Sequence, residues 1–319
     1  MNFYRRKKVI SRRNSGLGDN LLATAHAWYF ANRNGRSLEI NWAPSMYFKD
    51  KSINAFGRFF KVPSEIGNVP IEYQNRVGFF KRLYRRLPLF PFKFFLSSLF
   101  AEITHKILRS RTPPKIMNIR DQRREWCMSL IKNEIKSNSR EILFNTHFDF
   151  LPQQEIKPFF DELQLIPKLQ EKIDNFSDRF FKDKKVIGMH VRYYDKSLPV
   201  SNHTPYWLEP EKSFERIESE VQEIISSLKG QDYVVYLATD SEIVYDFAKN
   251  KIPNLVTYNK RFQNVTFTFD LHHKVEEKAY EDDLIEMFLL AKSDILYRYP
   301  PSESWFSYYG SLYAKKVII

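Results

Sequence analysis

The sequence of 319 residues contains one cysteine, Cys127, so an internal disulfide is excluded and a reducing compartment is favoured. A lone cysteine without a companion motif is more typical of packing than of catalysis. No uncharged apolar run reaches the roughly eighteen residues of a membrane-spanning helix, so we expect none. The basic N-terminus lacks the apolar stretch of a signal peptide. Together these absences predict a cytoplasmic protein.

Residue clusters that bind metals or act as nucleophiles are also missing. His272 and His273 are neighbours, and neighbouring side chains in a strand point to opposite faces, so joint metal ligation is not expected. No Asp-x-Asp pair follows a predicted strand, and neither a Ser/His/Asp set nor a Walker loop is present. We therefore expect no metal and no cofactor.

What the sequence has in excess is positive charge. Lys and Arg number 50 against 38 Asp and Glu, which gives a formal net charge of +12. An anionic partner is expected, and the charge alone leaves three classes open: nucleic acid, a membrane surface and a phosphorylated substrate.

Length and residue pattern predict two α/β domains, because a chain of this size exceeds what a single hydrophobic core supports. Buried strands alternate with helices in both halves, which indicates parallel sheets with ligands at the carboxyl ends of the strands. Strands are predicted at 9–10, 38–42, 185–192, 233–238, 255–258 and 295–299, and helices at 21–31, 155–182, 209–228, 243–249 and 281–293. We place the domains at residues 1–165 and 166–319, each Rossmann-like.

Gly16 and Gly18 lie between the first predicted strand and helix. Glycines let a ligand approach the backbone, and a helix N-terminus offers N–H groups to phosphate. Asn20 and Leu21 stand where the dinucleotide fingerprint has its third glycine. A phosphate loop and a plain tight turn both remain open.

The strongest signal for phosphate binding follows the predicted strand at 185–192. The Arg192 guanidinium can form two hydrogen bonds with one phosphate, and Lys196 adds a positive charge nearby. Asp195 either orients Arg192 or acts as a base. The alternative is a surface ion-pair network.

Polar residues also follow the other strands of this half. Asp240 and Ser241 end one strand, and Ser302 and Ser304 lie on a turn after the last one, where hydroxyls suit a phosphate. Glu286 is flanked by apolar residues, so partial burial is expected. A buried carboxylate needs a partner, and a guanine edge supplies two donors. For Asp240 and Ser241 the alternative is a capped helix end, and for Glu286 it is a solvated glutamate.

Residues 79–111 contain eight Lys or Arg among seven phenylalanines, with Glu102 as the only acid. They suit either a membrane-surface or acceptor-binding element, or core helices with a solvated basic face. No recognised nucleic-acid motif accompanies them, so nucleic acid is not the expected partner.

Three of these segments, in order, resemble the signatures of α-1,6-fucosyltransferases: His-Val-Arg-x-x-Asp-Lys at 190–196, Tyr-Leu-Ala-Thr-Asp at 236–240, and Leu-Ile-Glu-Met at 284–287 through Ser304. The stretch 203–211 and Arg-Tyr-Pro-Pro at 298–301 are closer to the bacterial nodulation (NodZ-like) fucosyltransferases. Their N-terminal loop and helix are similar to residues 16–30. The resemblance covers residues 9–42 and 185–312.

This resemblance implies a GT-B-like, inverting, metal-independent glycosyltransferase. It would transfer fucose from GDP-fucose to a cell-surface glycan or its lipid-linked precursor. The membrane-surface interpretation of 79–111 would add peripheral contact with the anionic inner membrane. Residues 1–165 would be the acceptor side and 166–319 the sugar-nucleotide domain. Another GDP- or dTDP-deoxyhexose donor stays an alternative, and a basic nucleic-acid-binding protein is the further alternative.

The resemblance also implies roles for single residues. Arg192 would hold the β-phosphate, and His190 and Glu286 would lie near guanine. The remaining nucleotide-binding candidates are Gly16, Gly18, Asp19, Asp240, Ser241, Ser302 and Ser304. Tyr193 stands where the signature has a second arginine. The glutamate that serves as base in the animal enzymes has no counterpart here, so Asp195 and His203 remain the candidates.

Overall fold

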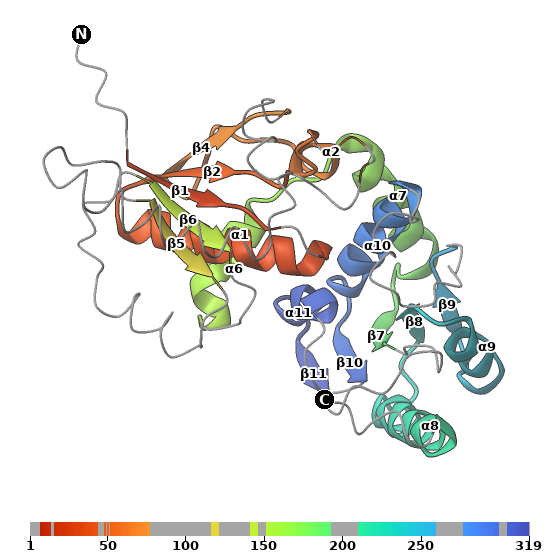
Figure 1. Ribbon diagram of the computed structural model, residues 1–319. Helices are drawn as coiled ribbons and strands as arrows, with labels where there is room; N and C mark the ends of the chain where they lie inside the picture. Colours follow the sequence, from red (N-terminus) through yellow and green to blue (C-terminus); the bar gives the residue numbers. More distant parts are fainter. Residues whose placement is uncertain are drawn as a thin grey trace, which may run out of the picture. The chain divides into compact units, whose positions relative to one another are not determined.

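The computed structural model describes residues 7–13, 16–43, 48, 50, 52–76, 116–120, 141–145, 151–192, 210–259, 277–299 and 305–318. The chain divides into two compact units, Met1–Gln164 and Leu165–Ile319. Each is built from a largely parallel sheet with helices packed on it (Figure 1). The predicted α/β class is confirmed. The basic segment 79–111 lies outside the described residues.

In the described part of the first unit, six strands pair in the order β3-β4-β2-β1-β6-β5. β3 is antiparallel to β4, and the other pairs are parallel. Their bounds are β1 Lys8–Ser11, β2 Ser37–Ile40, β3 Glu65–Ile66, β4 Val69–Tyr73, β5 Ile116–Arg120 and β6 Glu141–Asn145. Parallel pairing brings the carboxyl ends of β1, β2 and β6 to one edge.

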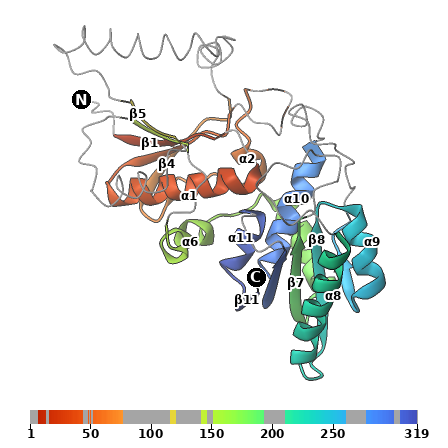
Figure 2. The same ribbon diagram turned by 60° about the horizontal axis from the view of Figure 1, so that its bottom comes forward.

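Helix α1 (Leu17–Arg33) lies along this sheet, and most of its residues are buried, including the polar Asn20, Thr24 and His26. The two hydroxyls of Ser11 and Thr24 are 2.9 Å apart, and the Trp28 indole donates to the Ile66 carbonyl at 2.8 Å. Helix α6 (Gln153–Asp161) packs on α1, as Figure 2 shows, and the short helix α2 (Phe56–Phe59) follows β2.

The sheet of the second unit is parallel, in the order β11-β10-β7-β8-β9. The strands are β7 Lys185–Val191, β8 Tyr233–Thr239, β9 Leu255–Thr257, β10 Ile295–Tyr299 and β11 Lys316–Ile318. The helices are α7 Pro167–Phe180, α8 Pro210–Ser227, α9 Glu242–Lys251, α10 Glu277–Leu290 and α11 Trp305–Ser311. The chain starts at β7 in the middle, adds β8 and β9 on one side, and then returns to the other. The strand order therefore reverses between β7 and β10.

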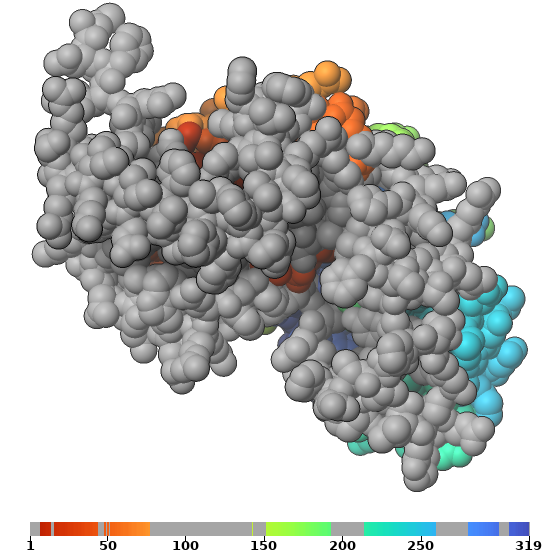
Figure 3. All heavy atoms as spheres, in the orientation of Figure 1, coloured from red at the N-terminus to blue at the C-terminus, as the bar shows by residue number. Residues whose placement is uncertain are grey.

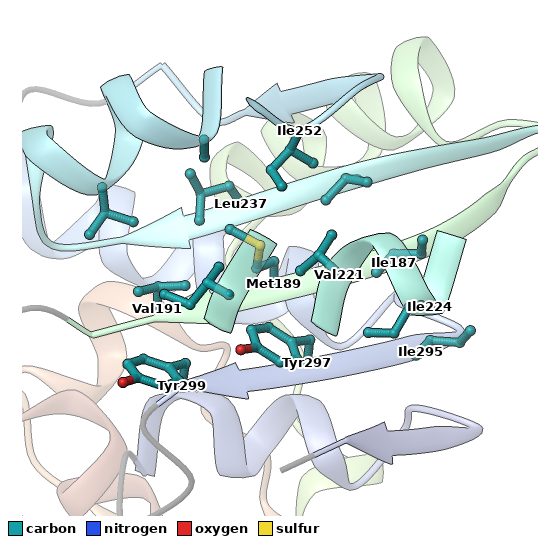
Figure 4. Close-up of a cluster of buried hydrophobic side chains, with 14 of the residues drawn as sticks. Ile187, Met189, Val191, Val221, Ile224, Leu237, Ile252, Ile295, Tyr297 and Tyr299 are labelled. Carbon is teal, nitrogen blue, oxygen red and sulfur yellow. The ribbon is translucent and has the colours of Figure 1, made fainter. Parts of the chain in front are cut away.

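Alternate residues of these strands face two different helix layers. Ile187, Met189 and Val191 pack with Tyr297 and Tyr299 of β10 beneath α8 and α9 (Figure 4). The outer faces of α8 and α9 are part of the surface of this unit (Figure 3). The core of this unit therefore lies on both faces of a sheet buried by helices.

The opposite face of the same sheet packs against α7, α10 and α11. Tyr236 is fully buried there, with ring centroids 5.6 Å from Phe176 and 5.5 Å from Phe181. Gly188 lies where α10 ends, and a Cβ at this position would overlap the Ser293 hydroxyl. A glycine is thus required for close packing in the middle of β7.

The helical stretch predicted at 155–182 is two helices rather than one. α6 ends at Asp161, and Pro167 takes the first position of α7, where its missing N–H costs nothing. No helix in the described ranges combines the length and hydrophobicity needed to span a membrane.

Candidate functional site

The carboxyl ends of β7, β8 and β10 lie side by side in the second unit. The Arg192 N–H, just beyond β7, donates to the Tyr299 carbonyl at the end of β10 with an N–O distance of 2.9 Å. This bond fixes the Arg192 backbone at the point where the strand order reverses. Doubly wound sheets bind their ligands at such a point.

The Arg192 side chain is 38% exposed, and its Nε is 3.9 Å from the Asp240 Oδ2 at the end of β8. Two residues predicted for the site are thus brought together. An ion pair this long and this exposed contributes little to stability. The side chain is therefore partly open to an anion, although its Nε is buried.

His190 lies at the same end of β7, only 6% exposed. Its imidazole stacks on the Phe306 ring of α11, with centroids 5.2 Å apart and planes 23° apart. This contact fixes the plane of the ring. The sequence did not reveal it, because Phe306 is a further 116 positions along the chain from His190.

Ser241 caps the N-terminus of α9. Its Oγ accepts from the Val244 N–H at 3.4 Å, and its own N–H donates to the Thr239 Oγ1 at 3.2 Å. The capped helix end, one of the two interpretations of this residue, is therefore present. A hydroxyl that accepts one bond keeps its proton as a donor, so Ser241 remains compatible with a bound phosphate.

Glu286 is more deeply buried than expected, at 2% exposure. Because α10 begins at Glu277 and not at the predicted residue 281, Glu286 is about two and a half turns into the helix. Burial raises the pKa of Tyr258 to about 12, and the negative charges of Asp282, Glu281 and Glu286 add to this effect. Burial and Glu286 also raise the pKa of Tyr236. The carboxylate lies close to two phenols, and a guanine base reaches it only if neighbouring side chains move.

The glycine loop belongs to the first unit. Gly16 is the N-cap residue of α1, with φ −57° and ψ 162°, and no side chain caps the helix there. A Cβ at Gly16 would meet nothing within 4 Å. Neither backbone conformation nor crowding within the chain therefore requires glycine at 16, which argues against the tight-turn interpretation. Gly18 and Asp19 are in the first turn of α1.

The remaining predicted site residues lie outside the described residues: Asp195, Lys196, His203, Ser302 and Ser304. Among the residues that are described, no group of three or more His, Cys, Asp or Glu side chains is arranged to hold a metal ion.

Proteins of known family resemble this chain over nearly its whole length. Nodulation protein Z of Bradyrhizobium diazoefficiens is 29% identical over 312 residues, which cover 97% of this chain and 80% of the relative. Nodulation protein Z of Sinorhizobium fredii is 27% identical over 312 residues, covering 97% and 92%.

Solved structures agree. The fucosyltransferase NodZ from Bradyrhizobium superposes with a TM-score of 0.71 at 23% identity, covering 98% of this chain and 94% of that one. A NodZ α-1,6-fucosyltransferase soaked with GDP-fucose gives a TM-score of 0.67 at 24% identity over the same shares. This likeness confirms the predicted fold, two Rossmann-like units of the GT-B-like type.

The sequence model of one family, Nodulation protein Z (NodZ), matches residues 5–319. The resemblance noted in the sequence is confirmed, and the chain belongs to the Nodulation protein Z family.

Proposed function

We propose that this protein transfers fucose from GDP-fucose to a hydroxyl group of a cell-surface glycan or its lipid-linked precursor, with inversion and without a metal. Membership of the NodZ family supports this, as does the likeness to an α-1,6-fucosyltransferase soaked with GDP-fucose. The observation that carries the proposal is the accessible Arg192 guanidinium beside Asp240, at the reversal of strand order.

In this reaction the bond between C1 of fucose and the β-phosphate oxygen breaks, and its electron pair stays on the diphosphate. The acceptor oxygen bonds to C1 and passes its proton to a base. Negative charge therefore develops on the leaving diphosphate, where fixed cations and donors lower the barrier most. Arg192 supplies the cation and the Ser241 hydroxyl a donor, with Lys196 as a second positive charge. Asp195 and His203 are the candidates for the base.

We propose that the first unit is the domain on the acceptor side of the reaction. The Gly16–Asp19 loop, at the N-terminus of α1, offers backbone N–H groups to a phosphate. The basic, phenylalanine-rich segment 79–111 suits contact with the anionic lipid that carries such acceptors. We place the protein in the cytoplasm, at the periphery of the inner membrane.

A thermal-shift screen with GDP, UDP, dTDP and CDP, followed by transfer assays with the matching sugar nucleotides, tests this function. GDP should stabilise most, and GDP-fucose should be consumed. Stabilisation and turnover with dTDP-sugars would instead identify the alternative deoxyhexose donor. No stabilisation by any of the four diphosphates would refute the proposal.

A further inference from the structure

Arg298, the fourth residue of β10, is a half-buried cation in the second unit. Its Nε is buried and makes no hydrogen bond among the described residues, and no carboxylate there forms an ion pair with it. By contrast, Lys185 at the start of β7 is 28% exposed and is paired with Asp294 at 3.1 Å.

An unpaired guanidinium in this position is costly. Burial lowers the pKa of Arg298, and among the described residues the one group whose negative charge would oppose this is Tyr308, a phenol that is ordinarily neutral at physiological pH. A cation withdrawn from water without a counter-ion destabilises a fold, whereas an apolar side chain of similar volume would not. Packing among the described residues therefore does not explain an arginine here. A bound anion would.

The backbone places Arg298 beside the proposed phosphate site. In the parallel pairing of β10 with β7, Arg298 is the partner of His190, so both side chains leave the same face of the sheet. Both meet α11: His190 stacks on Phe306, and Arg298 lies near Tyr308. Arg192 is two residues beyond His190, and its N–H is bound to Tyr299, the residue after Arg298.

Arg298 and Arg192 thus flank the point where the strand order reverses, one on each of the two strands that define it. This chain also has Tyr193 where a second arginine stands in the α-1,6-fucosyltransferase signature. We propose that Arg298 is a further cation of the donor site, in addition to Arg192 and Lys196, and that it binds the nucleotide diphosphate together with Arg192, which restores the positive charge that Tyr193 does not provide. This inference rests on the proposed function.

Two neutral variants, Arg298→Met and Arg298→Gln, test it by isothermal titration with GDP. Each should bind GDP about tenfold more weakly or worse, the loss expected for a charge-assisted hydrogen bond. Binding of guanosine, which has no phosphate, should change less than about twofold and is measured by saturation-transfer NMR. The melting temperature without ligand should stay equal or rise, because an unpaired buried charge has been removed.

The matched control is Arg179→Met, in which an exposed arginine of α7 is neutralised in the same unit. It should bind GDP like the unmodified protein. If Arg298→Met does not fold, Arg298→Gln decides alone, since it keeps a polar side chain.

Three results would overturn the inference while leaving the proposed function intact: unchanged GDP affinity in both variants, equal losses for GDP and guanosine, or a lower melting temperature with normal GDP binding. The proposed function fails separately, if the unmodified protein binds no GDP.

Discussion

Acid should destabilise the first unit through one residue, His26. This histidine is fully buried in the middle of α1, and burial lowers its pKa from 6.5 to about 3. The unfolded chain therefore binds a proton at His26 below about pH 6.5, while the folded chain does so only near pH 3. Because the unfolded state binds more protons within this window, stability falls as the pH falls through it.

The size of the effect follows from the shift. Each pH unit within the window costs about 1.4 kcal/mol, so about pH 5 lies roughly 1.5 units below the unfolded pKa and costs about 2 kcal/mol. Such a loss is a large part of the total stability of an ordinary domain, which is about 5–15 kcal/mol.

The assay compares urea unfolding of the wild type and of His26→Gln at about pH 7 and about pH 5. Glutamine keeps a polar side chain but does not titrate. Trp28 and Trp42 are buried in the same unit, so tryptophan fluorescence follows its unfolding. The wild type should lose about 2 kcal/mol more than the variant between the two pH values.

The comparison is insensitive to the other titrating groups, because these are the same in both proteins. His26→Gln will also change the stability at neutral pH, and that offset cancels in the difference. Equal pH dependence in the two proteins would show that His26 is protonated freely in the fold and would refute the reasoning.

Four further outcomes are expected from the proposed site. Arg192→Ala should lower transfer about 100-fold or more without unfolding the protein, since it faces the charge of the leaving group, and Arg192→Lys should also be poor because an ammonium makes no two-pronged contact. Near-normal turnover of folded Arg192→Ala in a fucosyl-transfer assay would contradict this. Glu286→Gln should weaken GDP binding by about 1–3 kcal/mol, as measured by calorimetry, because a donor replaces an acceptor in a buried site, and UDP binding should be unaffected. Equal stabilisation by all nucleoside diphosphates would argue against the role. EDTA should leave transfer unchanged; full loss that Mn²⁺ or Mg²⁺ restores would mean that a metal holds the diphosphate. The protein should co-sediment with anionic liposomes at low salt and dissociate from them at high salt. The double variant Arg85→Glu with Arg86→Glu should bind them more weakly. If the unmodified protein does not bind such liposomes at low salt, the basic residues of 79–111 have another role.

The second unit was largely predictable because its elements carry strong local signals. β7, β8 and β10 are mostly apolar and buried, with polar residues at or just after their ends, and α8 repeats its apolar positions at the helical period. The proximity of Arg192 and Asp240 could be predicted from their positions after two strands, because parallel strands bring their carboxyl ends to one edge of the sheet.

Residues 43–76 were not predictable in the same way, because α2, β3 and β4 are two to five residues long. Periodicity needs a longer window. These pieces are held by tertiary contacts instead: the Asn54 amide donates to the Ile40 carbonyl at 2.8 Å, and the Tyr73 hydroxyl accepts from the Gly57 N–H at 3.1 Å.

Within the site, the unpredicted features depend on which helix the fold brings to a strand. The stacking of Phe306 on His190 and the buried Arg298 Nε, which makes no hydrogen bond to the described residues, both arise where α11 meets the sheet. Neither is encoded in local sequence around the strand concerned. The capping role of Ser241, by contrast, could be predicted from local sequence, because a hydroxyl between a strand and a helix allows two interpretations and a helix cap is one of them.

Gly188 gives the nucleotide site an unusual sensitivity to mutation. Since a Cβ there would overlap the Ser293 hydroxyl and come within 3.3 Å of the Leu290 side chain, even alanine must displace Ser293 and crowd the last residue of α10. Glu286 is about one turn back from that end of the helix, so we expect the crowding to reach it. In a library of all substitutions at position 188, losses of stability and of nucleotide recognition would therefore occur together. A position with no side chain of its own would then rank among the least tolerant in the unit.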